Sequence, residues 1–360
     1  MKIPSSPRYK FATHMALETF TYFNVLSFPI DVKALIKSEG IRLKKYSTIA
    51  KRVGISLDEV CKEYQTDLAY IFRQSSGEYA IAYNDTKPEY VIRFSLAHEL
   101  GHYALMHLED FDETILRYRG NGLIEKKYQV LEKEANCFAR NLVSPAPVAD
   151  VIPQEMYQLY FGIGYGAEQT RINLLRSDKY YTKLLNSDIG KKHFSRLRRR
   201  ISHTHKCLNC KACVVRKKIN FCPICQSDEL KKLDLRELID LERQGKIMKY
   251  SSIELGENKF PIRCPRCENE DINSNEKFCP ICCTYLKNIC IGKGPFYEDA
   301  DELYPSFPID RENNGCGKEL IGSARYCSDC GGLSSYFNQG LLSFWVNEKE
   351  KYDILGEMPF

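Results

Sequence analysis

The chain has 360 residues, of which 43% are hydrophobic and 28% are charged, with one Trp and 16 Cys. This length predicts two or three domains, and the hydrophobic fraction excludes a wholly disordered chain. No apolar run reaches the roughly 18 residues that a membrane span needs, and residues 1–7 lack the apolar core of a signal peptide. We therefore expect a cytoplasmic protein that does not enter a membrane.

Charge is nearly balanced along the chain except in one block. Residues 1–190 hold 24 Lys and Arg against 23 Asp and Glu, and residues 191–360 hold 28 against 24. Residues 191–218 hold 11 basic residues and no acidic residue. Such a block is a candidate for contact with a nucleic-acid backbone. We favour a solvated linker helix whose positive charge offsets nearby thiolates.

The N-terminal residues predict three short elements before a sheet. Residues 8–47 have the pattern of a long helix, a short helix that ends near Gly40, and a strand. Ser56 should cap the next short helix by accepting a hydrogen bond from the N–H of Glu59.

The following residues predict a hairpin and then only helices. The elements are extended runs at 68–73 and 79–83, a helix from Pro88 to about His107, a polar loop at 109–120, a helix from about Glu125 to Val143, and two helical stretches within 153–186. Helices, a small sheet and further helices in this order indicate an α+β domain.

The helix after the hairpin contains His98-Glu99-Leu100-Gly101-His102. Residues i and i+4 lie on one helix face, so His98 and His102 can present two imidazole nitrogens to one metal ion. Glu99 lies beside that face, where it can take a proton from a water on the ion and deliver it to a leaving amine. The pentapeptide is expected by chance in on the order of one in a hundred such chains. Its place in an amphipathic helix that follows a strand favours a zinc hydrolase.

A catalytic zinc takes three protein ligands, and the helix at 125–143 offers two carboxylates for the third place. Glu132 shares a face with small residues and with Asn136, which could brace a ligating His. Glu134 shares its face with larger side chains. We favour Glu132 as the third ligand, with Glu134 as the alternative.

These stretches resemble the ImmA/IrrE family of zinc metallo-endopeptidases. The matching segments are residues 79–84, 93–102, 132–139, 142–145 and 161–164, within a resemblance that covers about residues 8–186. The resemblance implies a zincin-like fold, zinc on His98, His102 and Glu132, and Glu99 as the general base. It also implies a protein substrate, namely a helix-turn-helix repressor whose cleavage controls a stress response or a mobile element.

The resemblance does not identify which residue of this chain would stabilise the oxyanion. Three residues near the motif are candidates for this role, namely Tyr83, Tyr103 and His107. We expect each of them to be structural.

The cysteines divide the chain, because only Cys61 and Cys137 precede the 14 that lie between Cys207 and Cys330. In a reducing compartment such clusters indicate metal sites before disulfides. Two sets have the same spacing, with two Cys-x2-Cys knuckles separated by eleven residues. They are Cys207, Cys210, Cys222 and Cys225, and Cys264, Cys267, Cys279 and Cys282. Each set can close a tetrahedron around a structural zinc, which predicts two zinc ribbons.

A third cysteine set is irregular. Cys327 and Cys330 form one knuckle, Cys316 is half of another, and Cys290 could complete the set across an insertion at 295–308. The alternative is a degenerate ribbon without metal. Four cysteines are left over as expected free thiols, namely Cys61, Cys137, Cys213 and Cys283. Pairing Cys210 with Cys213 is a rival first knuckle, but it breaks the shared spacing.

The predicted organisation has five segments. They are a zincin-like metallopeptidase domain at 1–190, a basic linker with the first ribbon at 191–228, a connecting helix at 229–259, the second ribbon at 260–289, and the third ribbon with the C-terminal tail at 290–360. We expect one catalytic zinc and two or three structural ones, and ribbons that recognise protein or sense a signal. The alternative hypothesis is a non-catalytic, peptidase-like scaffold whose ribbons bind nucleic acid or protein.

Overall fold

The computed structural model describes residues 4–74, 76–110, 122–183, 188–244, 247–256, 258–292 and 315–356. The chain divides into two compact units, Met1–Arg198 and Arg199–Phe360. Within the described ranges, no helix has the length and apolar character needed to cross a membrane. Most of the predicted loop at 109–120 and the whole predicted insertion at 295–308 lie outside the described residues.

A three-stranded sheet organises the first unit. Its strands are β1 (Arg42–Lys45), β2 (Ala69–Arg73) and β3 (Tyr79–Tyr83), in the order β1-β3-β2. β2 and β3 form the predicted antiparallel hairpin, with Ile71 opposite Ile81. β1 runs parallel to β3 on its other side, with Leu43 also opposite Ile81. β2 is therefore an edge strand, and its outer side is available to other groups.

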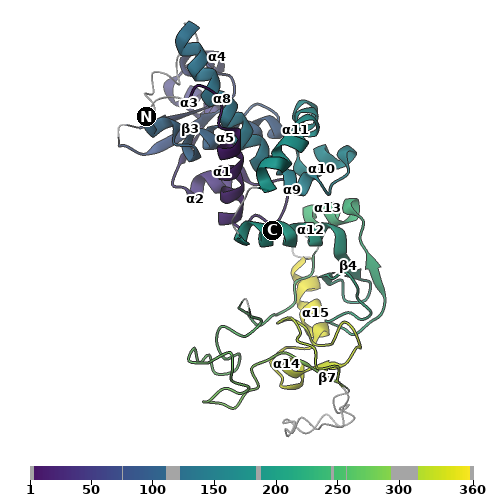
Figure 1. Cartoon of the computed structure of the whole chain (residues 1–360). Coiled ribbons are helices and arrows are strands. Elements are labelled where there is room, and N and C mark those ends of the chain that lie inside the picture. The colour runs from purple at the N-terminus through teal and green to yellow at the C-terminus, as the bar shows by residue number, and fades with distance from the viewer. Residues whose placement is uncertain are drawn as a thin grey trace. The chain divides into compact units, whose positions relative to one another are not determined.

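Helices cover this sheet in the predicted α+β arrangement. Helix α5 (Glu89–Ala104) packs on β2 and β3, and α8 (Gly122–Val143) packs on α5. Gly101 permits this close approach, because a Cβ there would lie 3.0 Å from the Phe138 ring and 3.2 Å from the Ala135 carbonyl oxygen. Helix α1 (Tyr9–Tyr22) packs on α8 and on α11 (Tyr165–Lys183) (Figure 1). The helix of the His-Glu-x-x-His motif therefore lies between the sheet and α8.

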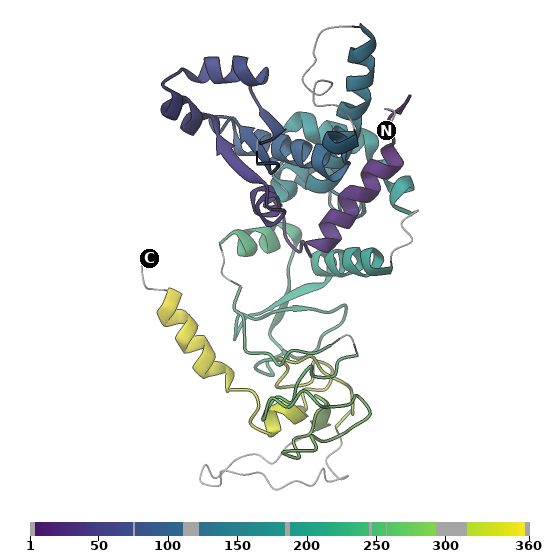
Figure 2. The ribbon, with the colours of Figure 1, turned by 90° about the vertical axis from the view of Figure 1, so that its left-hand side faces the viewer.

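Shorter helices complete the first unit. They are α2 (Val32–Ser38), α3 (Tyr46–Val53), α4 (Leu57–Tyr64), α6 (His107–Asp110), α9 (Ala146–Ala149), the 3-10 turn η1 (Gln154–Met156) and α10 (Tyr157–Phe161). The predicted cap of α4 is confirmed, since the Ser56 hydroxyl accepts from the Glu59 N–H at 3.2 Å. Helix α3 was not predicted. In Figure 2, α3 and α4 lie on the opposite side of this unit from α1.

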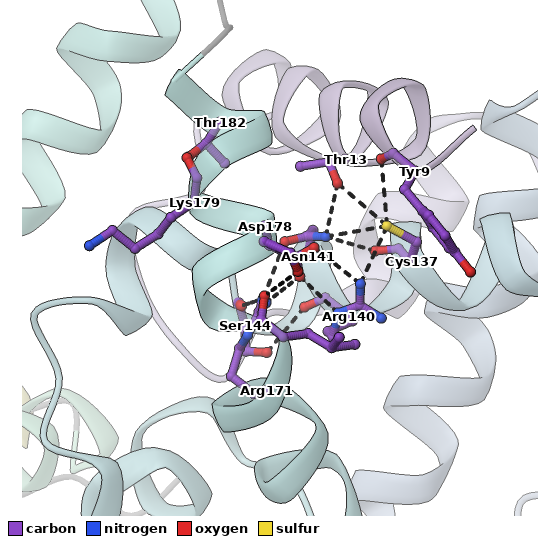
Figure 3. Close-up of polar contacts among 12 residues, drawn as sticks. Tyr9, Thr13, Cys137, Arg140, Asn141, Ser144, Arg171, Asp178, Lys179 and Thr182 are labelled. Carbon is purple, nitrogen blue, oxygen red and sulfur yellow. Dashed lines mark hydrogen bonds and ion pairs between the residues drawn. The ribbon is translucent and has the colours of Figure 1, made fainter. Parts of the chain in front are cut away.

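A buried polar network joins α8 to α11 (Figure 3). Arg171 is fully buried and donates to the Ser144 carbonyl oxygen at 2.8 Å and to the Asp178 carboxylate. Arg140 donates to the same carboxylate at 2.9 Å. A buried guanidinium is tolerated only when it is paired in this way. The pairing therefore holds α11 in one position against α8.

The described residues of the second unit form little regular structure. Its strands are β4 (Thr204–Cys207), β5 (Cys213–Val215) and β6 (Leu230–Lys232), in the order β5-β4-β6, and the separate pair β7 (Cys290–Gly292) and β8 (Leu333–Ser334). The helices are α12 (Asp188–His203), which begins in the first unit, α13 (Leu235–Arg243), α14 (Ser335–Asn338) and α15 (Trp345–Gly356). The buried clusters are small and contain cysteines, for example Cys207, Cys210 and Cys222 with Ile224. Segments with cores this small ordinarily need a metal or a cross-link to fold.

Candidate metal centre and catalytic cleft

Two histidines of α5 and one glutamate of α8 meet at a single point. His98 Nε2 and His102 Nε2 lie 3.1 Å apart. The Glu132 carboxylate oxygens lie 3.3 Å from His98 Nε2 and 3.2 Å from His102 Nε2. The three ligand atoms all lie within 4.8 Å of one another and could hold a metal ion. Two imidazoles and one carboxylate, with room for a further ligand, form the donor set of a catalytic zinc site.

The charges in this cluster favour a cation. Burial would raise the pKa of Glu132, but its hydrogen bonds with His102 and His98 outweigh burial and hold the pKa well below the usual range. Burial lowers the pKa of His102 to about 4. Burial also acts to lower the pKa of His98, but Glu132 outweighs it and raises the pKa to about 9. The carboxylate thus attracts one positive charge, either a proton on His98 or a metal ion in its place.

Hydrogen bonds on the far side of each imidazole set its tautomer. Asn136 Oδ1 accepts from His98 Nδ1 at 3.1 Å. Glu134 Oε2 accepts from His107 Nε2 at 3.2 Å, so His107 Nδ1 can accept from His102 Nδ1, which lies 3.0 Å away. Both histidines can therefore keep a proton on Nδ1, which would leave the Nε2 lone pairs free for a metal ion that replaces the proton shared with Glu132.

Glu134 occupies a different position from Glu132. Its carboxylate is fully buried and accepts from the Arg8 backbone N–H at 2.7 Å and from Arg8 Nη2 at 2.7 Å. Burial alone would raise the pKa of Glu134, but His107 and Arg8 outweigh it and lower the pKa to about 2. Of the two carboxylates considered from the sequence, Glu132 is the one that reaches the imidazoles of His98 and His102. Glu134 instead contacts His107.

Glu99 contacts the edge of the sheet and lines the same cavity as the histidine pair. Its side chain is on α5, and Glu99 as a whole is only 8% exposed. Its Oε2 atom accepts from the backbone N–H of Ile71 in β2 at 2.9 Å. This bond holds the carboxylate against β2, on the wall of the cavity that the cluster residues also line.

A cavity of about 570 Å³ opens onto these groups. Its walls include the edge-strand residues Ala69, Tyr70 and Ile71, the aromatic residues Tyr64, Phe94 and Tyr128, and the cluster residues His98, Glu99, His102, Glu132 and Asn136. The three oxyanion candidates do not line it. Tyr83 and His107 are buried, and the Tyr103 ring packs edge-on against Tyr79 with centroids 5.4 Å apart. Sequence reasoning did not single out Tyr64, Tyr70 or Tyr128, because no motif distinguishes them from other tyrosines.

Comparison with known families agrees with this geometry. Residues 50–173 match the family model of the IrrE N-terminal-like domain, Peptidase M78. The first unit contains a Peptidase M78 domain. The matched range holds both α5 and α8, so the M78 domain includes the cluster of His98, His102 and Glu132. A search of curated proteins found no match to the chain.

Outside the M78 domain, three sets of four thiols could also hold metal ions. The closest sulfur pairs within the sets are 3.5 to 3.6 Å apart, near the roughly 3.8 Å between sulfurs of a tetrahedral zinc–thiolate site. The third set combines Cys290 with Cys316, Cys327 and Cys330. All 16 cysteines are free thiols, and Cys61, Cys137, Cys213 and Cys283 belong to none of the sets.

Proposed function

We propose that this protein is a zinc-dependent endopeptidase of the cytoplasm. The observation that carries the proposal is the convergence of two oriented Nε2 atoms and the Glu132 carboxylate beside Glu99. A scaffold has no need of Glu99, which is not part of the ligand cluster. The Peptidase M78 match supports the same reaction class, and free clustered thiols are typical of a reducing compartment.

The chain supplies a base and a binding site for this reaction. His98, His102 and Glu132 would hold the zinc, which when bound lowers the pKa of a water and polarises a peptide carbonyl. Glu99 accepts the proton of the attacking water and later delivers it to the leaving amine nitrogen. The Ile71 N–H keeps the Glu99 carboxylate in place through both transfers.

The position of the cavity favours an extended polypeptide as the substrate. One wall of the cavity is formed by residues 68–71, which are the first three residues of the edge strand β2 and the residue before it. An edge strand offers backbone groups that an extended peptide can pair with, which places a scissile bond near the cluster. From the ImmA/IrrE resemblance we propose a helix-turn-helix repressor as the substrate, with cleavage controlling a stress response or a mobile element.

We assign the three thiol sets to structural zinc ions that stabilise a recognition or sensing module. A closed four-thiolate site has no position for a substrate. The basic residues at 191–218 are partly used within the second unit, since Arg200 pairs with Glu242 at 2.7 Å and Arg216 lies 3.7 Å from Asp329. These pairs favour a protein partner over a nucleic acid.

The proposal is tested by comparing the zinc-loaded chain with its Glu99→Gln variant. Candidate repressors encoded beside the gene are incubated with each protein, also in cells under stress, and the products are identified by mass spectrometry. We expect cleavage by the wild type and a loss of about 1,000-fold in the variant, with zinc content unchanged. Equal survival of every candidate under activating conditions would instead support a non-catalytic scaffold. Salt-dependent nucleic-acid binding that falls when Arg198 and Arg199 are neutralised would support the same conclusion.

A further inference from the structure

Two of the cysteine knuckles in the second unit are paired with each other through their backbones. They are the second knuckle of the first set, residues 220–226, and that of the third set, residues 325–331. In each knuckle, the two residues before the first Cys donate their N–H groups to the other knuckle. Both N–H groups bond to the same carbonyl oxygen there, that of the residue which follows the first Cys. The four bonds are Asn220 and Phe221 to Ser328, at 2.9 and 3.1 Å, and Arg325 and Tyr326 to Pro223, at 2.8 and 3.0 Å. The pairing therefore has a local two-fold pattern.

Side chains cover this paired region. Gln226 Nε2 donates to the Gly331 carbonyl oxygen at 2.7 Å. The Phe221 ring lies against Gly331, where a Cβ would be 3.4 Å from it. Ile224 is only 4% exposed and belongs to an apolar cluster against which Trp345 packs. In the first set, the knuckle is therefore covered, at Phe221 by the third-set knuckle and at Ile224 by the apolar cluster of its own set.

The second cysteine set contains the same knuckle. Phe-Cys-Pro-Ile-Cys occurs at 221–225 and again at 278–282. The internal turns also match. The N–H of the first Cys donates to the carbonyl oxygen five residues later at 2.8 Å in both, and the carbonyl oxygen of that Cys accepts from the N–H four residues later at 2.9 Å in both. That fourth residue is left-handed in each knuckle, with φ of 66° at Gln226 and 57° at Cys283.

In the second set, however, this surface is exposed. Ile281 is 70% exposed and Phe278 is 46% exposed, compared with 4% for Ile224. Phe278 and Tyr285 form an antiparallel bridge, as Tyr326 and Leu333 do in the third set. In the third set, this bridge leaves the N–H of Tyr326 pointing outward, where it bonds to the knuckle at 220–226. The equivalent Phe278 N–H and the Pro280 carbonyl oxygen have no hydrogen-bond partner among the residues that the structure describes.

We propose that residues 277–283 bind the same residues of a second copy of this chain, forming a two-fold dimer. The N–H groups of Lys277 and Phe278 donate to the Pro280 carbonyl oxygen of the other copy, and the reverse bonds follow by symmetry. The knuckle carries both the donors and the acceptor of the pattern seen between 220–226 and 325–331. Two identical knuckles can therefore satisfy that pattern with an isologous contact. Contact between the copies also removes Phe278 and Ile281 from water.

The dimer is tested by sedimentation of the full-length, zinc-loaded protein. The contact is small, so we expect reversible association in the micromolar range. Ile281→Asp should raise the dimer dissociation constant at least about tenfold by placing two charges at the contact. Ile321→Asp is the matched control, because Ile321 is 55% exposed and lies outside the knuckle. Zinc content, measured for each variant, identifies any loss of folding.

A second measurement keeps the proposal testable if Ile281→Asp does not fold. Wild-type chains with and without ¹⁵N are mixed and treated with an amine cross-linker, and mixed-isotope peptides are sequenced. We expect Lys277 to be linked to Lys277 of the other copy. A monomer at all concentrations up to about 100 µM, a dimer unaffected by Ile281→Asp, or links from Lys277 only to other segments or other proteins would each overturn the proposal.

Discussion

His102 Nδ1 lies 3.0 Å from Nδ1 of His107, so a candidate ligand is braced by a second, fully buried histidine. His107 is in turn held by Glu134, which accepts from Arg8 near the N-terminus of α1. This chain of contacts ties the geometry of the cleft to the packing of α1 on α8. The first prediction concerns this connection.

Replacing His107 with Ala should weaken metal binding without removing a ligand. His102 Nδ1 loses its acceptor, so the imidazole can rotate and change tautomer. We expect zinc affinity at the cleft to fall by about 10- to 100-fold, measured by competition with a chelator. His14→Ala is the control, because His14 is on the surface of α1 with a side chain 47% exposed. Equal affinity in the His107→Ala and His14→Ala proteins would show that His107 does not position His102.

The two glutamates of α8 should respond differently to replacement by Gln. Glu132→Gln removes the carboxylate that contacts both imidazoles, so zinc affinity should fall by more than about 100-fold, beyond the range for residues that only brace a ligand. Glu134→Gln should keep a full zinc content. It should instead lower the free energy of unfolding by about 3 kcal/mol, because Arg8 and His107 lose a buried charged partner. The reverse pattern would make Glu134 the third ligand.

The buried network between α8 and α11 should dominate the stability of the first unit. Asp178→Asn leaves Arg171 and Arg140 without their shared carboxylate. We expect the free energy of unfolding, measured in urea, to fall by about 3–5 kcal/mol. Asp150→Asn is the matched control. Asp150, at the end of α9, pairs with Lys179 of α11, but both side chains are partly exposed, at 30% and 37%. Loss of this pair should therefore cost less than about 1 kcal/mol. Similar effects of the two substitutions would contradict this account.

The number of zinc ions bound per chain should show how many of the thiol sets hold a metal ion. We expect four zinc ions per chain, one at the cleft and one at each of the three sets. Cys290→Ser should reduce the content to three, because the third set then keeps only three thiols. Cys283→Ser should leave four, because Cys283 is exposed and belongs to none of the sets. A wild type with three zinc ions and no change in Cys290→Ser would identify the third set as degenerate.

The local elements were predictable because their signals extend over few residues. The hairpin, the cap at Ser56 and the helices that carry the cleft follow from alternation, capping chemistry and helical periodicity, and the structure confirms them. Helix α3 and the parallel pairing of β1 with β3 were not predicted. Parallel pairing joins strands distant in the chain, and it has no turn sequence to reveal it.

The sequence by itself determined which groups could share a metal ion, since one helical turn relates His98 to His102 and a short turn relates each Cys-x2-Cys pair. Only the tertiary structure decided which carboxylate reaches the histidines, and that Cys290 joins Cys327 and Cys330 across a long segment. It also decided that one Phe-Cys-Pro-Ile-Cys knuckle is covered and its duplicate is exposed. The reason is physical. Spacing governs neighbours within a few residues, whereas helix packing and knuckle pairing depend on surfaces brought together from distant parts of the chain.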